Sequence, residues 1–276
     1  MLRFLVLGAL VFALARPQLF EDRAKRTVDG IDMMLAIDTS GSMRALDLEW
    51  QGERMNRLSV VKRVLNDFYE QRPNDRMGVV VFGTEAFMQV PLTLDQKILK
   101  TLTARLSIGM AGDATAIGDA VAMATKGLKE IDADTKVIIL LTDGSNTAGS
   151  IDPAQAAEIA KSLQVKVYTI AVGSKGRAPM PVKGFFGESV QYVPVELDEK
   201  LLKSIAETSG GQYFRAETTE DLQKVYETID QLEKREIKGE QTIEGQDVFK
   251  WFVMMAGIFM GFELLFNSSK MRALPV

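Results

Sequence analysis

Residues Ile31–Ser42 read I-D-M-M-L-A-I-D-T-S-G-S, and this stretch decides the fold. It begins as an apolar run of the length of a buried strand, then changes at Asp38 to a carboxylate, two serines and a glycine. Asp38, Ser40 and Ser42 alternate along the turn, so their oxygens can converge on one point. Oxygen ligands suit a hard cation such as magnesium. The alternative is that these residues only cap the following helix.

Two later segments carry residues of the same kind. The glycine-bearing loop Gly109–Thr115 ends in a threonine, and the apolar run Val137–Leu141 is followed by T-D-G, which places Asp143 at the carboxyl end of a strand. In parallel α/β sheets, ligands bind beyond the carboxyl ends of the strands, where the strand order reverses. The sequence therefore predicts that Asp38, Thr115 and Asp143 meet at this edge of the sheet.

Buried strands alternate with amphipathic helices along the middle of the chain. Continuous apolar runs such as Met77–Phe82 and Val165–Val172 predict strands buried on both faces. Spacings of three and four between apolar residues predict helices, one of them from Arg54 to Arg72. This alternation predicts an α/β fold, doubly wound and Rossmann-like, whose mostly parallel sheet is covered by helices on both faces. The segment Gly173–Val195, rich in glycine and proline, is expected to form a long loop or a projecting hairpin.

The composition excludes several classes of site. The net charge of -4 and the lack of a basic stripe argue against nucleic acid as a partner. Cysteine and histidine are both absent from the sequence. Their absence excludes disulfides, thiolate or histidine-ligated metal sites, and catalytic pairs of the Ser-His-Asp and Cys-His kinds.

Additional apolar sequence lies at the two ends of the chain. Phe4–Ala15 has no polar residue, but these twelve residues at helical rise cover only about 18 Å of a roughly 30 Å hydrocarbon core. With its flanks, the segment of residues 1–20 is predicted to be a membrane anchor, and the alternative is a signal peptide. Val248–Phe266 is the better candidate for a transmembrane helix, with only two charges, each near an edge. Its alternative is an apolar helix docked on the soluble domain.

The predicted order of parts follows from these segments. It is an apolar membrane segment (1–20), a linker (21–30), the α/β domain (31–236), a second linker (237–247), a transmembrane helix (248–266) and a tail (267–276). The first apolar segment has one basic residue ahead of it, Arg3, and is followed by a denser group, Arg16, Arg23, Lys25 and Arg26. This count of charges by itself would keep the domain on the cytoplasmic side.

The sequence contains D-T-S-G-S at Asp38–Ser42, a threonine at Thr115 and T-D-G at Thr142–Gly144. Together these three segments resemble the metal-ion-dependent adhesion site (MIDAS) of von Willebrand factor type A domains. All five ligand positions of that motif are filled, by Asp38, Ser40, Ser42, Thr115 and Asp143. The resemblance covers about Asp32 to Glu233 and implies six main strands with one antiparallel edge. It also implies a magnesium site, with manganese as an alternative. The three hydroxyls would ligate the ion, the two aspartates would hold waters around it, and an open position would receive a partner's carboxylate.

A finer resemblance is to the membrane-anchored von Willebrand A proteins of the bacterial Bat aerotolerance group, in particular its BatA-like members. It rests on A-L-A-R-P-Q at Ala13–Gln18, the long loop before Leu197, the T-S-G-G turn at Thr208–Gly211 and the terminal apolar helix. Members commonly carry one more apolar segment ahead of the first of these stretches. The resemblance implies a protein-binding module of the bacterial inner membrane, with its domain in the periplasm. It further implies partners that include a MoxR-type AAA+ ATPase and other Bat proteins, in envelope assembly or stress tolerance.

Two other functions are weighed against a non-enzymatic binding module. A metal-dependent phosphoesterase would also begin with an Asp at a strand end and magnesium. Such enzymes need a second Asp two residues on, where this chain has Ser40, and no histidine is available as a base. A solute-binding domain would close the segment Gly173–Val195 over a small ligand. The residues favour ligand exchange at a metal over catalysis.

Overall fold

The computed structural model describes residues 31–131, 135–184, 187–194, 197–232 and 249–271, with short stretches between 4 and 29 and between 236 and 247. Contacts divide the chain into one unit of Val28–Ile237 and another of Met1–Thr27 with Lys238–Val276. The predicted domain of residues 31–236 lies within the first unit. Most of the two predicted linkers, 21–30 and 237–247, lies outside the described residues.

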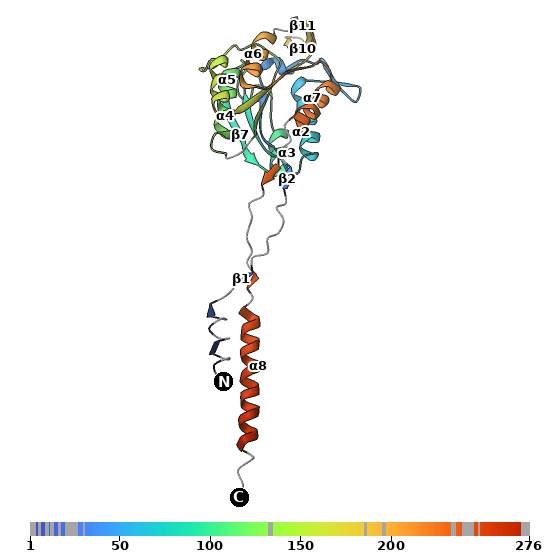
Figure 1. Ribbon diagram of the computed structural model, residues 1–276. Helices are drawn as coiled ribbons and strands as arrows, with labels where there is room; N and C mark the ends of the chain where they lie inside the picture. The colour runs from blue at the N-terminus through green and yellow to red at the C-terminus, as the bar shows by residue number, and fades with distance from the viewer. Residues whose placement is uncertain are drawn as a thin grey trace. The chain divides into compact units, whose positions relative to one another are not determined.

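A six-stranded sheet forms the centre of the larger unit (Figure 1). Its strands lie in the order β12 (Tyr213–Ala216), β9 (Val165–Val172), β8 (Lys136–Thr142), β3 (Asp32–Asp38), β6 (Arg76–Phe82) and β7 (Ala86–Thr93). Neighbouring strands are parallel except β7, which runs antiparallel to β6 at the edge. The predicted mostly parallel sheet with one antiparallel edge is confirmed.

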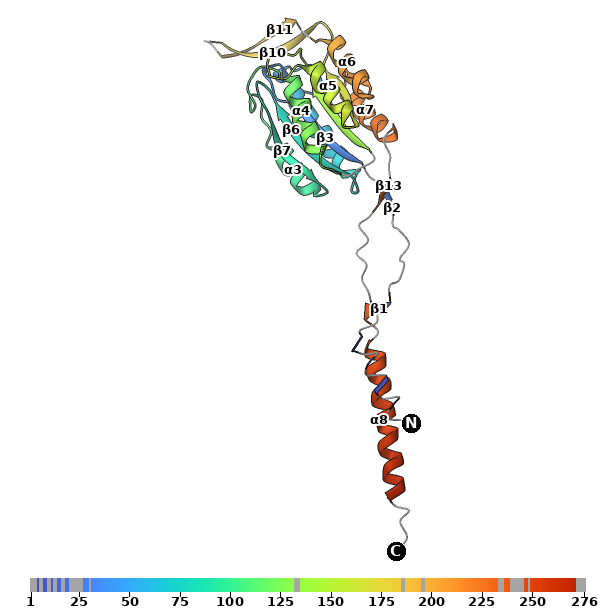
Figure 2. The ribbon, with the colours of Figure 1, turned by 60° about the vertical axis from the view of Figure 1, so that its left-hand side comes forward.

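Helices cover both faces of this sheet (Figure 2). Alternate side chains of β3 point to opposite faces, so Leu35 belongs to one apolar cluster and Met34 to the other. The Leu35 side is covered by α2 (Arg57–Glu70), α3 (Gln96–Ala104) and α7 (Thr219–Leu232). The Met34 side is covered by α4 (Ile117–Leu128), α5 (Pro153–Ser162) and α6 (Glu199–Ser209). Burial on both sides explains why the strands read as continuous apolar runs.

The helix that the sequence predicts from Arg54 begins three residues later, at Arg57. Its predicted start was therefore wrong. The segment before it forms a small hairpin of β4 (Leu48–Trp50) and β5 (Glu53–Met55). Gly52 allows its tight turn at a φ of 83°. The side chain of Asn56 then accepts a 2.8 Å hydrogen bond from the Ser59 N–H and caps α2. Local turn and cap chemistry therefore outweighs the apolar spacing at this helix start.

The segment rich in glycine and proline forms the second of its two expected structures, a projecting hairpin. It consists of β10 (Arg177–Gly184) and β11 (Gly187–Pro194), which extend beyond the sheet (Figure 2). The base of the hairpin is fastened next to a short 3-10 helix, η1 (Gly41–Arg44), because the N–H of Leu46 donates a 2.8 Å hydrogen bond to the carbonyl of Pro179. This contact brings the hairpin close to the end of β3.

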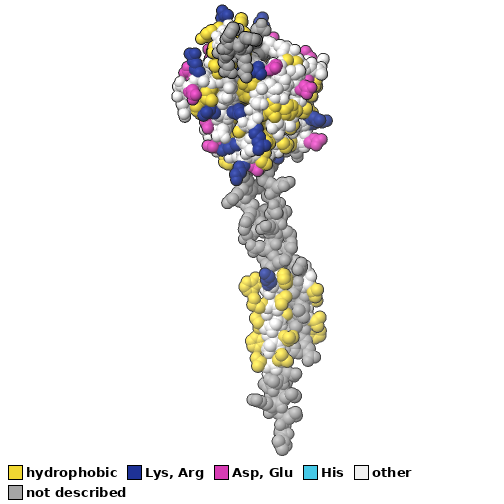
Figure 3. Space-filling model, turned by 180° about the vertical axis from the view of Figure 1, so that it is seen from behind, with side chains coloured by type: hydrophobic (Ala, Val, Ile, Leu, Met, Phe, Trp, Pro, Cys, Tyr) yellow, Lys and Arg dark blue, Asp and Glu magenta, His cyan; other side chains and the backbone are white. Residues whose placement is uncertain are grey.

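The terminal segments contribute short strand pairs and one long helix. The strands are β1 (Gln18–Leu19) with β14 (Gln246–Asp247), and β2 (Thr27–Asp29) with β13 (Glu236–Lys238). The helix is α8 (Phe249–Met271), which runs past the predicted end at residue 266 and exposes apolar side chains such as Trp251 and Leu264 (Figure 3).

Within the part of the chain that the structure describes, no helix combines the length and the apolar character needed to cross a membrane. The predicted transmembrane helix of residues 248–266 is therefore not confirmed. Most of the predicted anchor, residues 1–20, and the last residues of the predicted tail lie outside the described residues.

Candidate metal centre

The five residues predicted to bind a metal lie around the carboxyl ends of two central strands. Asp38 ends β3, Ser40 and Ser42 follow in the turn and in η1, Thr115 precedes α4, and Asp143 follows β8. The strands β3 and β8 are parallel neighbours, so their ends lie side by side. The strand order reverses here, because β6, the next strand of this sheet along the chain, pairs on one side of β3 and β8 pairs on the other. This is the usual position of a ligand site in such a sheet.

Hydrogen bonds connect four of the five residues. The hydroxyl of Ser42 donates to Oδ1 of Asp143 at 2.5 Å and lies 3.0 Å from the hydroxyl of Ser40. The carboxylate of Asp38 accepts the Ser40 N–H at 2.8 Å and the Thr142 hydroxyl at 2.7 Å. The structure thus brings these residues together, and it adds Thr142 as a residue that orients Asp38. Thr142 belongs to the T-D-G segment, but its role was not predicted.

Thr115 reaches the cluster from a loop that is bonded to the serine turn. The N–H of Gly109 donates to the Thr39 carbonyl at 2.6 Å, and the N–H of Gly41 donates to the Asp113 carbonyl at 3.1 Å. The N–H of Thr115 itself donates to the Thr147 hydroxyl at 3.0 Å. Thr115, Ser42 and Asp143 line one cavity of about 350 Å³. The structure therefore places hydroxyl and carboxylate oxygens from three segments around a single open space.

The two aspartates of the cluster lack full charge compensation. Asp38 is fully buried, and this burial, with the nearby charge of Asp143, raises its pKa to about 7 against the hydrogen bonds of Ser40 and Thr142. Burial also raises the pKa of Asp143, although the charge of Arg57 opposes the rise. A cation among these carboxylates would favour their ionised forms.

The donor set fits a hard divalent ion. It consists of two carboxylates and three hydroxyls, all oxygen, which suits magnesium or manganese. Among the described residues, no three acidic side chains gather into a metal-binding group. An ion at this edge would therefore depend on the hydroxyls of Ser40, Ser42 and Thr115 as much as on Asp38 and Asp143.

The same set of segments is characteristic of a known family, and the sequence pattern of the von Willebrand factor type A domain matches residues 32–228. The chain belongs to the von Willebrand factor type A domain family. Domains of this family are typically non-enzymatic interaction modules, and they commonly bind a metal at the MIDAS. The predicted family is confirmed.

Solved structures place this von Willebrand A domain near the Bat proteins. BatB, a conserved hypothetical protein from Bacteroides thetaiotaomicron, is 28% identical, with a TM-score of 0.64 over 74% of this chain and 98% of that one. An aerotolerance-related membrane protein from Bacteroides fragilis is 29% identical, with a TM-score of 0.60 over 72% and 98%. The resemblance to this group is confirmed.

A more distant structure shares the fold of the domain. Proximal thread matrix protein 1 from the mussel byssus is 21% identical, with a TM-score of 0.55 over 81% of this chain and 49% of that one. That protein is described with a zinc-occupied MIDAS motif.

This von Willebrand A domain also holds a buried arginine beside the predicted metal residues. Arg57, at the start of α2, donates to Oδ2 of Asp143 at 2.7 Å and makes two hydrogen bonds to Asp47, of 2.8 and 2.5 Å. Asp47 in turn accepts 2.9 Å hydrogen bonds from both the N–H and the hydroxyl of Ser174, just before β10. The sequence analysis did not predict roles for Arg57 and Asp47. No spacing pattern indicates that Arg57 pairs with Asp143, 86 residues away, or that Asp47 pairs with Ser174, 127 residues away.

The hairpin completes the cavity of the domain. One wall carries the predicted metal residues Ser42, Thr115 and Asp143. An apolar part of the lining comes from both hairpin strands, with Ala178, Met180, Val193 and Pro194. The predicted metal site therefore opens into a space with a polar side and an apolar side.

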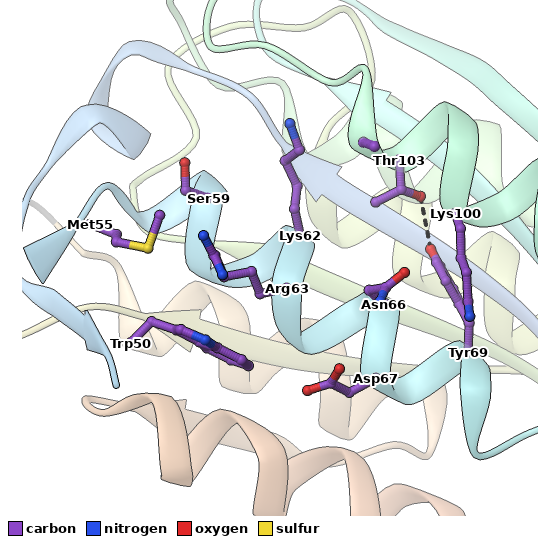
Figure 4. A pocket seen from close by; sticks show the side chains of 11 residues that line it. Trp50, Met55, Ser59, Lys62, Arg63, Asn66, Asp67, Tyr69, Lys100 and Thr103 are labelled. Carbon is purple, nitrogen blue, oxygen red and sulfur yellow. Dashed lines mark hydrogen bonds between the residues drawn. The ribbon is translucent and has the colours of Figure 1, made fainter. Parts of the chain in front are cut away.

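A second cavity, of about 400 Å³, shares no lining residue with the first (Figure 4). It lies along α2 and α3, where Trp50 contributes an apolar surface. Its two lysines are engaged, since Lys62 donates to the Leu106 carbonyl at 2.9 Å and Lys100 pairs with Glu70 at 2.7 Å. Its arginine, Arg63, lies 5.8 Å from the centre of the Trp50 ring. Its lining carries one carboxylate, Asp67, and does not repeat the paired carboxylates and hydroxyls of the metal centre.

Proposed function

We propose that this chain is a membrane-anchored, magnesium-dependent protein-binding module and that it is not an enzyme. The observation that carries the proposal is a cluster of three hydroxyl residues and two buried aspartates at the switch point of the sheet. Three members of this cluster, Ser42, Thr115 and Asp143, line one open cavity. Magnesium fits this all-oxygen donor set, and manganese is the alternative. The zinc-occupied motif of the mussel protein supports a divalent ion at this place in the fold.

The residues divide the binding task between them. Ser40, Ser42 and Thr115 would hold the ion through their hydroxyls, while Asp38 and Asp143 would hold it through waters. When bound, the ion supplies a positive charge and a coordination position for a carboxylate. Because three of the five residues are neutral, an Asp or Glu side chain of a protein partner fits this site better than a neutral group.

The Bat likeness supports a place in the bacterial envelope. One neighbour is named an aerotolerance-related membrane protein. We place the present chain in the inner membrane through residues 1–20 and 248–266, with its domain in the periplasm. In this setting the partners are a MoxR-type AAA+ ATPase and other Bat proteins, and the role is complex assembly or envelope stress tolerance.

Capture of partners with and without the metal tests the proposal. The full chain is immobilised in detergent, exposed to membrane extract with magnesium or with chelator, and its captured proteins are identified by mass spectrometry. We expect a set of proteins that is lost in chelator and lost with Ser40→Ala. The control Ser162→Ala removes a hydroxyl that bonds only within α5, to the Ile159 carbonyl, and should keep the set.

Two outcomes contradict the proposal. Capture that is the same in chelator and with Ser40→Ala would show that the metal residues do not bind the partner. Hydrolysis of a phosphoester that is lost with Asp38→Asn would establish an enzyme in place of a binding module.

A further inference from the structure

The cavity beside the predicted metal residues has a wall that their sequence motif does not supply. Ala178 and Met180 lie two residues apart on β10, and Val193 lies directly opposite Ala178 on β11. Residues opposite each other or two apart on a strand share a face of the hairpin. This face lines the same cavity as Ser42 and Asp143.

The hairpin is fastened in this position by polar contacts at its base. Leu46 binds the Pro179 carbonyl, and Ser174 makes two hydrogen bonds to Asp47, whose side chain is only 4% exposed. Ala178 is itself buried. The apolar wall therefore has a fixed place next to the metal residues and is not a loosely attached loop.

The size and chemistry of the cavity define its occupant. At about 350 Å³ it is near the lower end of the range of about 300 to 1,000 Å³ for ligand sites, enough for one or two side chains. Its polar side attracts a carboxylate once an ion is bound, and its hairpin side presents apolar surface. The acidic side chain at the rim, Asp113, pairs with Arg44 at 3.1 Å, so its charge is partly compensated.

Recognition by side chains fits the hairpin better than addition of a strand. Pro179 and Pro181 lie on β10 and have no N–H. The strand therefore cannot offer a continuous row of donors to a further strand. At β10 a partner is therefore recognised better through its side chains, which in the cavity meet Met180 and Val193.

We infer that the cavity recognises an extended protein segment in which an acidic residue stands next to an apolar one. The carboxylate binds at the metal residues and the apolar side chain packs on the hairpin face formed by Ala178, Met180 and Val193. This inference rests on the proposed function and adds to it the sequence preference of the partner.

Short labelled peptides of defined sequence test the inference on the full chain in detergent, with fluorescence polarisation as the measurement. The probes are Gly-Gly-Leu-Asp-Gly-Gly and its Asp-Leu reversal, a version with Ser in place of Leu, and a version with Asn in place of Asp. In saturating magnesium, the Leu-Asp peptide or its Asp-Leu reversal should bind about tenfold more tightly than the peptide with Ser in place of Leu. This is the expected gain in affinity from burying much of one Leu side chain. The Asn version should bind no better in magnesium than in chelator.

Two valines of β11 provide a matched pair of variants. Val193 lines the cavity and is 41% exposed, whereas Val190 lies on the other face of the hairpin and is 54% exposed. Val193→Asp should remove the preference for Leu, and Val190→Asp should keep it. Met180→Gln is a milder change in the same wall and should also reduce the preference for Leu. It provides the test if Val193→Asp disturbs the hairpin. All three variants should keep the magnesium-dependent rise in melting temperature.

The outcomes separate the inference from the proposed function. Equal, magnesium-dependent binding of the Leu and Ser peptides would overturn the inference and leave the proposed function standing. If Val190→Asp and Val193→Asp reduce the preference for the Leu peptide equally, the inference is also overturned, because the added charge would then explain the effect. If no acidic peptide binds in a magnesium-dependent way, the proposed function is overturned as well.

Discussion

The guanidinium of Arg57 donates a 2.7 Å hydrogen bond to Asp143, and both side chains are nearly inaccessible, at 2% and 0% exposure. The other edge of the same guanidinium binds Asp47. Burial opposes the charge on Arg57, but the two carboxylates more than offset this effect and raise its pKa above the usual value. A fixed positive charge therefore lies beside a predicted metal residue, and Arg57 and Asp143 both line the same cavity.

Replacing Arg57 should destabilise the domain strongly. Arg57→Met would leave Asp47 and Asp143 buried without their partner, and breaking a buried ion pair costs about 3 to 5 kcal/mol. Urea unfolding in chelator measures the loss. The control Arg63→Met changes an exposed arginine of the same helix that lies 5.8 Å from the centre of the Trp50 ring, so it should cost no more than about 1 kcal/mol. Equal effects of the two changes would contradict the structural role given to Arg57.

Gly173 should not tolerate a side chain. Its φ is 116°, and a Cβ there would lie 2.4 Å from Nη2 of Arg57. Gly176 also has a positive φ, 89°, but a Cβ there would meet nothing within 4 Å. Gly176→Ala should therefore cost only the backbone strain, about 1 to 2 kcal/mol. Gly173→Ala should cost about 1 to 3 kcal/mol more, because Arg57 must move. Thermal or urea unfolding of both variants checks this difference, and equal losses would argue against the close approach.

Acid should weaken the domain in part through Asp47. Burial alone would raise the pKa of Asp47, but the hydrogen bonds and charge of Arg57 and the donors of Ser174 lower it below 3.8. The Asp47 carboxyl therefore binds a proton more readily in the unfolded chain than in the folded domain. Its ionised form stabilises the folded domain above the unfolded pKa, and this stabilisation is lost as the pH falls through the folded pKa.

The variant Asp47→Asn isolates this contribution. It should be less stable than the wild type near neutral pH, since Arg57 loses a charged partner. Its unfolding free energy, measured by urea at a series of pH values from about 7 to about 3, should also fall less steeply below about pH 5. An acid slope as steep as that of the wild type would rule out a lowered pKa of Asp47.

Thr115 should matter for the metal more than for the fold. Thr115→Val keeps the shape of the side chain and the backbone bonds to Thr147 and Ala148 but removes the hydroxyl. Magnesium at about 100 times its Kd should stabilise the wild type by about 2.7 kcal/mol, and the variant clearly less. The control Thr125→Val removes a hydroxyl that bonds within α4, so it should lower stability by about 1 kcal/mol and keep the magnesium response. An unchanged response in Thr115→Val would remove Thr115 from the ligand set.

Local patterns predicted the central strands correctly. The run at β3 reads D-M-M-L-A-I-D and is buried along its whole length, as a strand between two helical layers must be. Asp152 caps α5 ahead of Pro153 by accepting from the Ala154 and Gln155 N–H groups, an order of residues that is typical of a helix start. The start of α2 was placed too early, because apolar spacing continues into residues that a hairpin and the cap at Asn56 exclude from the helix.

The sequence by itself determined the family, the parallel sheet and the gathering of Asp38, Thr115 and Asp143 at one edge. It could do so because each of these residues follows or precedes a regular element, and parallel strands end at the same edge of a sheet. The metal itself and the ligand role of each residue stay predictions.

Only the tertiary structure decided what surrounds that edge. Arg57 meets Asp143 across 86 residues of chain, and Asp47 meets Ser174 across 127. Such pairings leave no periodicity in the sequence, since they depend on how loops from distant elements fold over one edge of the sheet. The same folding brings the apolar face of the β10–β11 hairpin to the cavity that Ser42, Thr115 and Asp143 line, so the predicted metal residues share one cavity with an apolar surface.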